Sequence, residues 1–135
     1  MRDESAGRQD LRKRTKEFAL RIIKLYAALP KTTEGQVIGK QILRSGTSVG
    51  AHYREACRAK SDADFISKIE GGLLELDETL YWLELLTAVE IVPAARLQPL
   101  ESETNELIAM FVSMVRNLKQ KKAGVVIPHP SALIP

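Results

Sequence analysis

Serine, histidine and glutamate side chains with the potential for chemistry fall at helical spacing in the middle of the chain: Ser45, Ser48, His52 and Glu55. The two serines lie about one and two helical turns before His52, so either one could pair with it as a nucleophile with its base. Acyl transfer also requires an oxyanion hole, yet the nearby glycines lie inside a helical pattern rather than in a nucleophile elbow or a phosphate-binding loop. We therefore expect no catalytic residue here and interpret His52 as a structural residue at the edge of the core.

The pairs His52-x-x-Glu55 and Glu75-x-x-Glu78 also have a spacing that carboxylate-bridged metal sites use in some four-helix bundles. Such sites contain Glu-x-x-His twice, whereas here the order is reversed and occurs once, and the first and last helical segments offer no matching inward carboxylate. Cys57 is the only cysteine, which excludes an intrachain disulfide. We expect no metal and no cofactor, and we interpret the carboxylates as members of a salt-bridge network.

Four segments of the chain repeat apolar residues at alternating spacings of three and four, the pattern of an amphipathic helix. Capping-box spacings at Thr33 with Gln36 and at Ser61 with Asp64 mark the starts of the second and third segments. Pro99 fits either in the first turn of a last helix that begins near Gln98, which we favour, or inside a kinked helix that begins near Pro93. Because the connections are short, we expect an all-α fold, an antiparallel up-down-up-down four-helix bundle in one domain of residues 1–124. The predicted helices span about 9–29, 34–59, 62–89 and 98–122.

The composition is that of a globular protein, with 44% hydrophobic and 27% charged residues among 135. The opening MRDESAGRQD contains no apolar signal region, and no apolar run approaches the roughly 20 residues of a membrane span. We therefore expect a cytoplasmic protein with no membrane partner. The last residues, 125–135, read VVIPHPSALIP and carry no charge apart from any protonation of His129. We expect them to form an extended or disordered C-terminal tail, with docking on a surface as the alternative.

The second predicted helix has an apolar stripe flanked by two unlike margins when it is turned by about 100° per residue. One margin carries Gly39, Gly46 and Gly50, which would let a neighbouring helix approach closely. The other margin is polar and needs partners, since buried hydroxyls, amides and charges are costly without hydrogen bonds. Glu75 and Glu78 of the third helix are the expected partners. We call the predicted set the polar seam: Gln41, Arg44, Ser45, Ser48, His52, Glu55, Glu75 and Glu78.

Several of these residues occur in an order that resembles a known family. The run Arg44-Ser45-Gly46-Thr47-Ser48-Val49-Gly50-Ala51, followed by Glu55-Ala56, Asp64-Phe65, Glu75, Glu78-Thr79 and Trp82-Leu83, is similar to the four-helix-bundle proteins encoded in intervening sequences of bacterial large-subunit ribosomal RNA genes. The resemblance extends from about Phe18 to Leu118. It implies a short up-down bundle, commonly a ring-shaped homo-oligomer and often a pentamer, with no established enzymatic activity. The fold is also similar to that of the accessory protein of diversity-generating retroelements, a basic oligomer linked to nucleic acid.

Charge is divided between segments, although the formal net charge is only +3. The first predicted helix is basic and the third is acidic, with Lys68 as the one basic residue between Asp62 and Glu90. The first and last helices are neighbours in an up-down bundle, so their basic residues could merge into one face that contacts the phosphates of RNA or DNA. This predicted basic face comprises Arg12, Lys13, Arg14, Lys16, Arg21, Lys24, Arg116, Lys119, Lys121 and Lys122.

The same division of charge supports an alternative. The first and third helices are diagonal in a square bundle, so a basic and an acidic surface would point in opposite directions, which suits a head-to-tail contact that closes into a ring. We therefore hypothesise a non-enzymatic oligomeric module associated with nucleic acid, without a small-molecule substrate. The alternative is a purely structural or adaptor homo-oligomer, because lysines used in a subunit contact are not available to phosphate.

Overall fold

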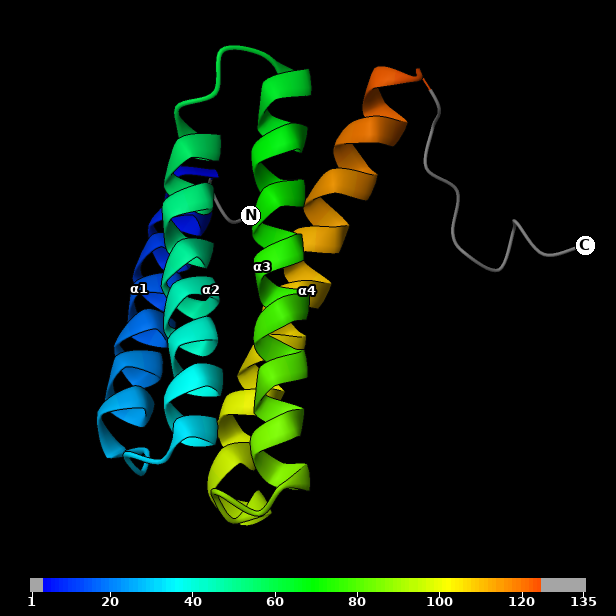
Figure 1. The fold of residues 1–135 in the computed structure, drawn as a ribbon. Coiled ribbons are helices and arrows are strands. Elements are labelled where there is room, and N and C mark those ends of the chain that lie inside the picture. The colour runs from blue at the N-terminus through cyan, green and yellow to red at the C-terminus, as the bar shows by residue number, and fades with distance from the viewer. Residues whose placement is uncertain (1–3, 125–135) are drawn as a thin grey trace, which may run out of the picture.

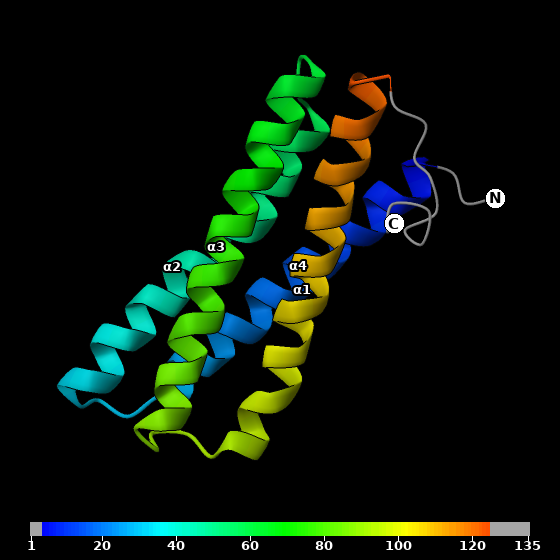
Figure 2. The same cartoon turned by 90° about the vertical axis from the view of Figure 1, so that its right-hand side faces the viewer.

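The computed structural model describes residues 4–124, and it describes side chains from residue 7 onward. Within this range the chain forms α1 (Glu4–Ala28), α2 (Thr33–Cys57), α3 (Asp62–Ala88) and α4 (Ala94–Lys122), and no strand (Figure 1). Successive helices run in opposite directions and are joined by short loops (Figures 1 and 2). The predicted all-α, up-down-up-down fold is confirmed, although α1 starts earlier than the predicted residue 9. The predicted tail, residues 125–135, lies outside the described residues.

Side-chain caps fix where α2 and α3 begin. Thr32 caps α2, one residue earlier than predicted, and its hydroxyl oxygen accepts a hydrogen bond from the Gly35 N–H at 3.2 Å. Ser61 caps α3 and accepts from the Asp64 N–H at 3.1 Å. The Asp64 carboxylate accepts in turn from the Lys60 N–H at 3.3 Å. These bonds satisfy backbone donors that have no partner within the first helical turn.

The start of α4 differs from the sequence prediction. The helix begins at Ala94, directly after its N-cap Pro93, and Pro99 lies inside the helix rather than in its first turn. Pro99 lacks the N–H that would bond to the carbonyl of Ala95, so this arrangement has a local cost. Leu97 is only 2% exposed, and its burial favours helix at this point. The predicted start near residue 98 is therefore wrong, because tertiary burial outweighs the proline penalty.

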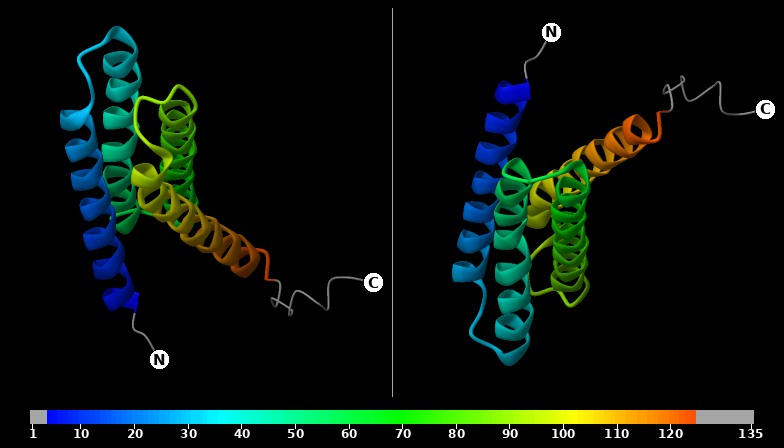
Figure 3. Two further views of the ribbon diagram at one scale, coloured as in Figure 1. Left: turned by 90° about the horizontal axis from the view of Figure 1, so that it is seen from below. Right: turned by 90° about the horizontal axis from the view of Figure 1, so that it is seen from above.

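The four helices do not enclose a symmetrical bundle. α2 packs between α1 and α3, and α3 packs on α4, whereas α1 and α4 touch only over a short stretch. Figure 3 shows the C-terminal half of α4, in orange, diverging from α1, in blue. The first and last helices are therefore neighbours only over a short stretch, and the start of α1 and the end of α4 do not lie together as expected.

One core nevertheless continues through all the helices. Its fully buried members include Ile22 of α1, Ile42 of α2, Leu76 of α3 and Phe111 of α4. The glycine margin of α2 faces α1, and a Cβ at Gly46 would lie only 2.6 Å from Cγ1 of Ile22. Close packing on this side leaves the polar margin of α2 directed at α3.

Candidate functional site

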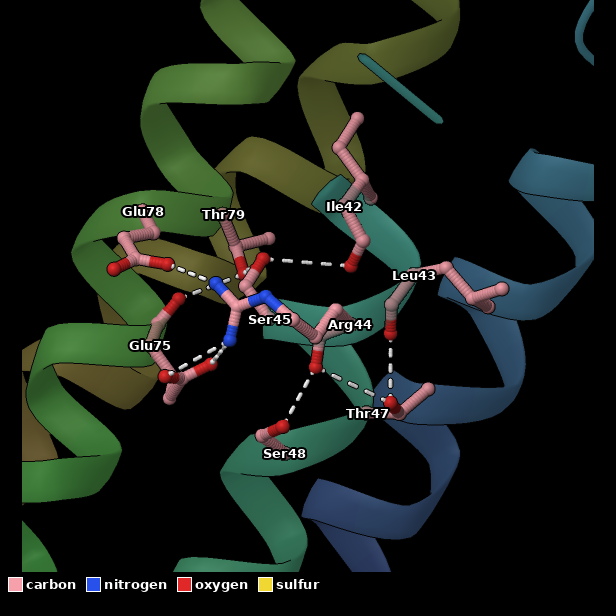
Figure 4. Close-up of polar contacts among 9 residues, drawn as sticks. All are labelled: Ile42, Leu43, Arg44, Ser45, Thr47, Ser48, Glu75, Glu78 and Thr79. Atoms are coloured by element: carbon pink, nitrogen blue, oxygen red, sulfur yellow. Dashed lines mark hydrogen bonds and ion pairs between the residues drawn. The ribbon is translucent and has the colours of Figure 1, made fainter. Parts of the chain in front are cut away.

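An ion-pair cluster joins α2 to α3 at the edge of the core (Figure 4). Nη1 of Arg44 donates to Oε2 of Glu75 at 3.2 Å, and its Nη2 donates to Oε2 of Glu78. The Arg44 side chain is 53% exposed while that of Glu75 is 14% exposed, so the arginine covers the carboxylate from the solvent side. The hydrogen bond with Glu78, followed by the charge of Glu75, raises the pKa of Arg44 above its usual value. The guanidinium therefore stays charged and acts as a clamp rather than as a proton donor.

A pair of buried hydroxyls lies next to this cluster. Ser45 and Thr79 are both fully buried, and Oγ of Ser45 lies 2.8 Å from Oγ1 of Thr79. The Thr79 hydroxyl also donates to the carbonyl oxygen of Glu75 at 2.8 Å. A hydroxyl has one proton, and the other acceptor near Ser45, the Ile42 carbonyl oxygen, is 3.4 Å away, so we assign Ser45 as the donor in the pair and Thr79 as the acceptor. The Ser45 hydroxyl is thus engaged in a structural hydrogen bond and is not exposed to attack a substrate.

Other members of the polar seam bond within α2 rather than across to α3. The Ser48 hydroxyl donates to the carbonyl oxygen of Arg44 at 2.6 Å, one turn back in the same helix. Thr47, which is not part of the seam, donates in the same way to the carbonyl oxygen of Leu43 at 2.6 Å. Gln41 is half-buried, and within residues 7–124 its side chain makes no hydrogen bond to α3. The cross-helix part of the seam is accordingly smaller than the predicted set.

His52 and Glu55 lie about one and two turns after Ser48 in α2, and both contact α3. The imidazole packs on two glycines, since a Cβ at Gly71 would lie 2.8 Å from Cε1 of His52 and one at Gly72 would lie 3.5 Å from its Cβ. Nδ1 of His52 is buried and has no hydrogen-bond partner among the described residues. Oε2 of Glu55 pairs with Nζ of Lys68 at 3.6 Å instead of joining the arginine cluster. The serine, histidine and glutamate of α2 are therefore not brought together as a catalytic set.

Arg14, a member of the predicted basic face, ties α1 to α4. Its Nε donates to Oε2 of Glu103 at 2.8 Å and its Nη2 to Oε1 of the same carboxylate at 2.6 Å, a bidentate pair. Nη2 also lies 3.2 Å from Oε1 of Glu106. The hydrogen bond with Glu103 is the main reason that the pKa of Arg14 is raised above its usual value. Because the Arg14 and Glu103 side chains are only 24% and 15% exposed, this arginine is occupied by the fold.

The remaining basic residues do not form one continuous surface. Nζ of Lys119 donates to Oε2 of Glu70 on α3 at 3.2 Å, and Arg12 is half-buried. The basic end of α4 points away from α1 (Figure 3), so the two clusters do not merge as expected. The other members of the predicted basic face are exposed: Lys13, Lys16, Arg21, Lys24, Arg116, Lys121 and Lys122.

The structure also shows partners that the sequence prediction missed. Thr79 is not in the predicted polar seam, although a threonine among the apolar residues of the third helix, opposite a serine of the second, is a usable signal for a cross-helix hydrogen bond. Glu103 and Glu106 had no such signal, because their partner Arg14 is far away in sequence.

Neither metal binding nor a transmembrane helix is found in the described part of the chain. Across residues 7–124, no three His, Cys, Asp or Glu side chains gather closely enough to hold an ion. Among the described helices, none combines the length and apolarity that crossing a bilayer requires. The polar groups described above instead bond chiefly to one another, so they brace the helices.

The fold and its seam define a class: an all-α, four-helix protein in which polar side chains hold adjacent helices together. Comparison with protein families identifies the family within this class. The model of the 23S rRNA-intervening sequence protein family matches residues 8–113. The chain therefore belongs to the 23S rRNA-intervening sequence protein family, which confirms the resemblance seen in its sequence.

A solved structure agrees with this assignment. The chain is similar to a protein with unknown function from the S23 ribosomal protein family of Bacteroides thetaiotaomicron, known from a crystal structure. The two are 39% identical with a TM-score of 0.76, and the match covers 81% of this chain and 97% of the other. No curated protein matches the chain.

Proposed function

We propose that the chain is a non-enzymatic helical module that assembles head to tail, with α1 of one copy against α3 of the next. The observation that carries this proposal is a pair of outward faces that expose large apolar side chains. Leu20 and Ile23 of α1 are 47% and 45% exposed, and Leu74 and Tyr81 of α3 are 65% and 53% exposed. The members of each pair are three or seven residues apart and so lie on one side of their helix. Grouped apolar side chains on a surface mark an interaction site.

The charges beside these apolar pairs are complementary. Exposed lysines flank the pair on α1, while exposed carboxylates flank the pair on α3. Since α2 lies between α1 and α3, the two surfaces are on different sides of one copy and can meet only between copies. A contact of this heterologous kind generates a ring when its rotation closes. We name the α1 face for Lys13, Lys16, Leu20, Ile23 and Lys24, and the α3 face for Leu74, Asp77, Tyr81 and Glu84.

The polar interior supports a structural role in the same way. The Ser45 hydroxyl, which is the most buried candidate nucleophile, donates to Thr79, and His52 packs on glycines away from it. Hydroxyls and carboxylates that bond between helices stabilise the fold and are not available to bind or attack a substrate.

Charge reversal tests the assembly. The double variants Lys16→Glu/Lys24→Glu and Asp77→Lys/Glu84→Lys should each lower the mass measured by light scattering after size-exclusion chromatography, since like charges across a contact cost several kcal/mol. Combining all four changes in one chain should restore the native mass, because complementarity returns. The control Lys40→Glu changes an exposed lysine of α2 outside both faces and should leave the mass unchanged. An unaltered mass in both double variants would remove the proposal.

Association with RNA is the second candidate function, because the α1 face exposes three lysines that could contact phosphates. A filter-binding titration against RNA at two salt concentrations tests it, since binding through several phosphates weakens steeply as salt rises. The two functions need the same lysines, and Lys16→Glu/Lys24→Glu separates them. Loss of RNA binding at unchanged mass favours RNA association, whereas no binding by the native chain at low salt leaves assembly alone.

A further inference from the structure

A groove of about 960 Å³ opens between the N-terminal half of α1 and the C-terminal half of α4, where these helices diverge. Its apolar lining comes from Leu11 of α1, Phe65 of α3, and Met110, Met114 and Leu118 of α4. All five side chains pack against the core but are only partly buried. Flexible methionines suit an adaptable binding surface, and the volume is within the range of ligand-binding sites. The groove is thus an edge of the core that no element within residues 4–124 covers.

The lining of the groove includes charged residues of both signs, Arg8, Asp10, Lys60, Asp62 and Lys121, but the part of it that α2 supplies is uncharged. Tyr53, which is 2% exposed, and the partly buried Cys57 line it from α2. Burial, together with a hydrogen bond to Cys57, raises the pKa of Tyr53, so its hydroxyl stays neutral. A segment that brings aliphatic side chains without charges would bury apolar area here without leaving an unpaired ion.

We propose that residues 125–135 of the same chain, VVIPHPSALIP, occupy this groove. The segment contains six aliphatic side chains and three prolines, and no Asp, Glu, Lys or Arg. It follows directly on Gly124 at the end of α4, and Leu118 and Lys121 in the last turns of that helix line the adjacent end of the groove. The segment therefore begins beside one end of the apolar groove.

The backbone at the end of α4 permits the return. Gly124 has a φ of +69°, the left-handed conformation in which a C-terminal glycine turns the chain away from the helix axis. The groove wall between Met110 and Lys121 covers about 17 Å of helix. Eleven residues reach roughly 34 Å in the extended conformation that prolines favour, so the segment is long enough to run back along the wall.

The family match separates these features from the rest of the bundle. It ends at residue 113, so Met114, Leu118 and residues 125–135 all lie beyond it. The part of the α4 wall that follows Ser113 and the proposed occupant thus both lie C-terminal to the matched region.

Cys57 provides a reporter for the occupied groove. We compare its alkylation by iodoacetamide, followed by mass spectrometry, in the native full chain and in the full-length variant Ile127→Asp/Leu133→Asp. The variant should react about tenfold faster, because a segment docked about 90% of the time leaves the thiol open only in the minor state. The conservative variant Ile127→Val/Leu133→Ile keeps the aliphatic character and should retain the native rate. In denaturant all three chains should react alike.

Two results would overturn the proposal. The first is an equal alkylation rate in the native chain and the aspartate variant, which would show that the segment does not cover Cys57. The second is protection that increases with protein concentration, which would place a second copy over the groove instead of the chain's own segment. Protection that is independent of concentration and lost only in the aspartate variant supports docking within one chain.

Discussion

The two margins of α2 are joined to their neighbours by opposite means. Toward α1, Gly46 presents almost no side chain, and Ile22 packs directly against the helix backbone. Toward α3, the buried hydroxyls of Ser45 and Thr79 bond across the interface and Arg44 bridges to two carboxylates. Packing on a glycine is a matter of shape, whereas a hydrogen bond also depends on direction. We infer that the α1 side sets how close the helices lie and that the α3 side sets their register.

Enlarging Gly46 should produce the largest effect, and it tests whether close packing sets the distance between α1 and α2. Because an added Cβ would lie 2.6 Å from Cγ1 of Ile22, Gly46→Val should lower the free energy of unfolding by about 2–3 kcal/mol through overpacking. Urea denaturation followed by circular dichroism measures this. Gly50→Ala is the matched control, since its Cβ would meet Oγ1 of Thr15 at 3.2 Å and helix propensity gains about 1 kcal/mol. If Gly46→Val were as stable as the native chain, shape would not set the α1–α2 distance.

Removing one hydroxyl from the buried pair should have the next largest effect, and it tests whether the Ser45–Thr79 hydrogen bond holds α2 against α3. Thr79→Val should cost about 2 kcal/mol, because Ser45 would keep only a weak contact with the Ile42 carbonyl oxygen at 3.4 Å. Ser45→Ala should cost about 1 kcal/mol, because Thr79 can still donate to the carbonyl oxygen of Glu75. The double variant should cost little more than Thr79→Val alone. Fully additive costs would show that the two hydroxyls do not act as a pair.

How much of this could be predicted from sequence depends on whether the cause is local. The helical spacing of apolar residues and the Ser61 cap act within a few residues, so the four helices and the start of α3 could be predicted. The start of α4 could not, since the cost of Pro99 is local while the gain from burying Leu97 comes from other helices. Helix propensity reflects only the local cost of Pro99 and not the burial of Leu97.

The candidate site divides in the same way. The seam could be anticipated, because a run of small and polar residues inside a helix requires partners on a neighbouring helix. Which hydroxyls cross the interface depends on rotamers, as Ser48 bonding back to its own helix shows. The Arg14–Glu103 pair depends on where α1 meets α4, and the angle between those helices is set by packing that no periodic pattern encodes.

Removing the exposed part of the seam should have the smallest effect and tests which polar group sets the register. Arg44→Ala should lower the free energy of unfolding by no more than about 1 kcal/mol, because the guanidinium is 53% exposed and water can take its place beside the largely buried Glu75 carboxylate. Thermal unfolding at 0.1 M and 1 M salt distinguishes it from the hydroxyl pair, since the Debye length falls to about 3 Å at 1 M and the effect of Arg44→Ala should shrink, while that of Thr79→Val persists. Glu55→Ala, which removes a pair with Lys68 of 3.6 Å, is the weaker control. A loss of stability from Arg44→Ala that matched the loss from Thr79→Val and did not change with salt would show that the arginine, rather than the buried hydroxyl pair, sets the register.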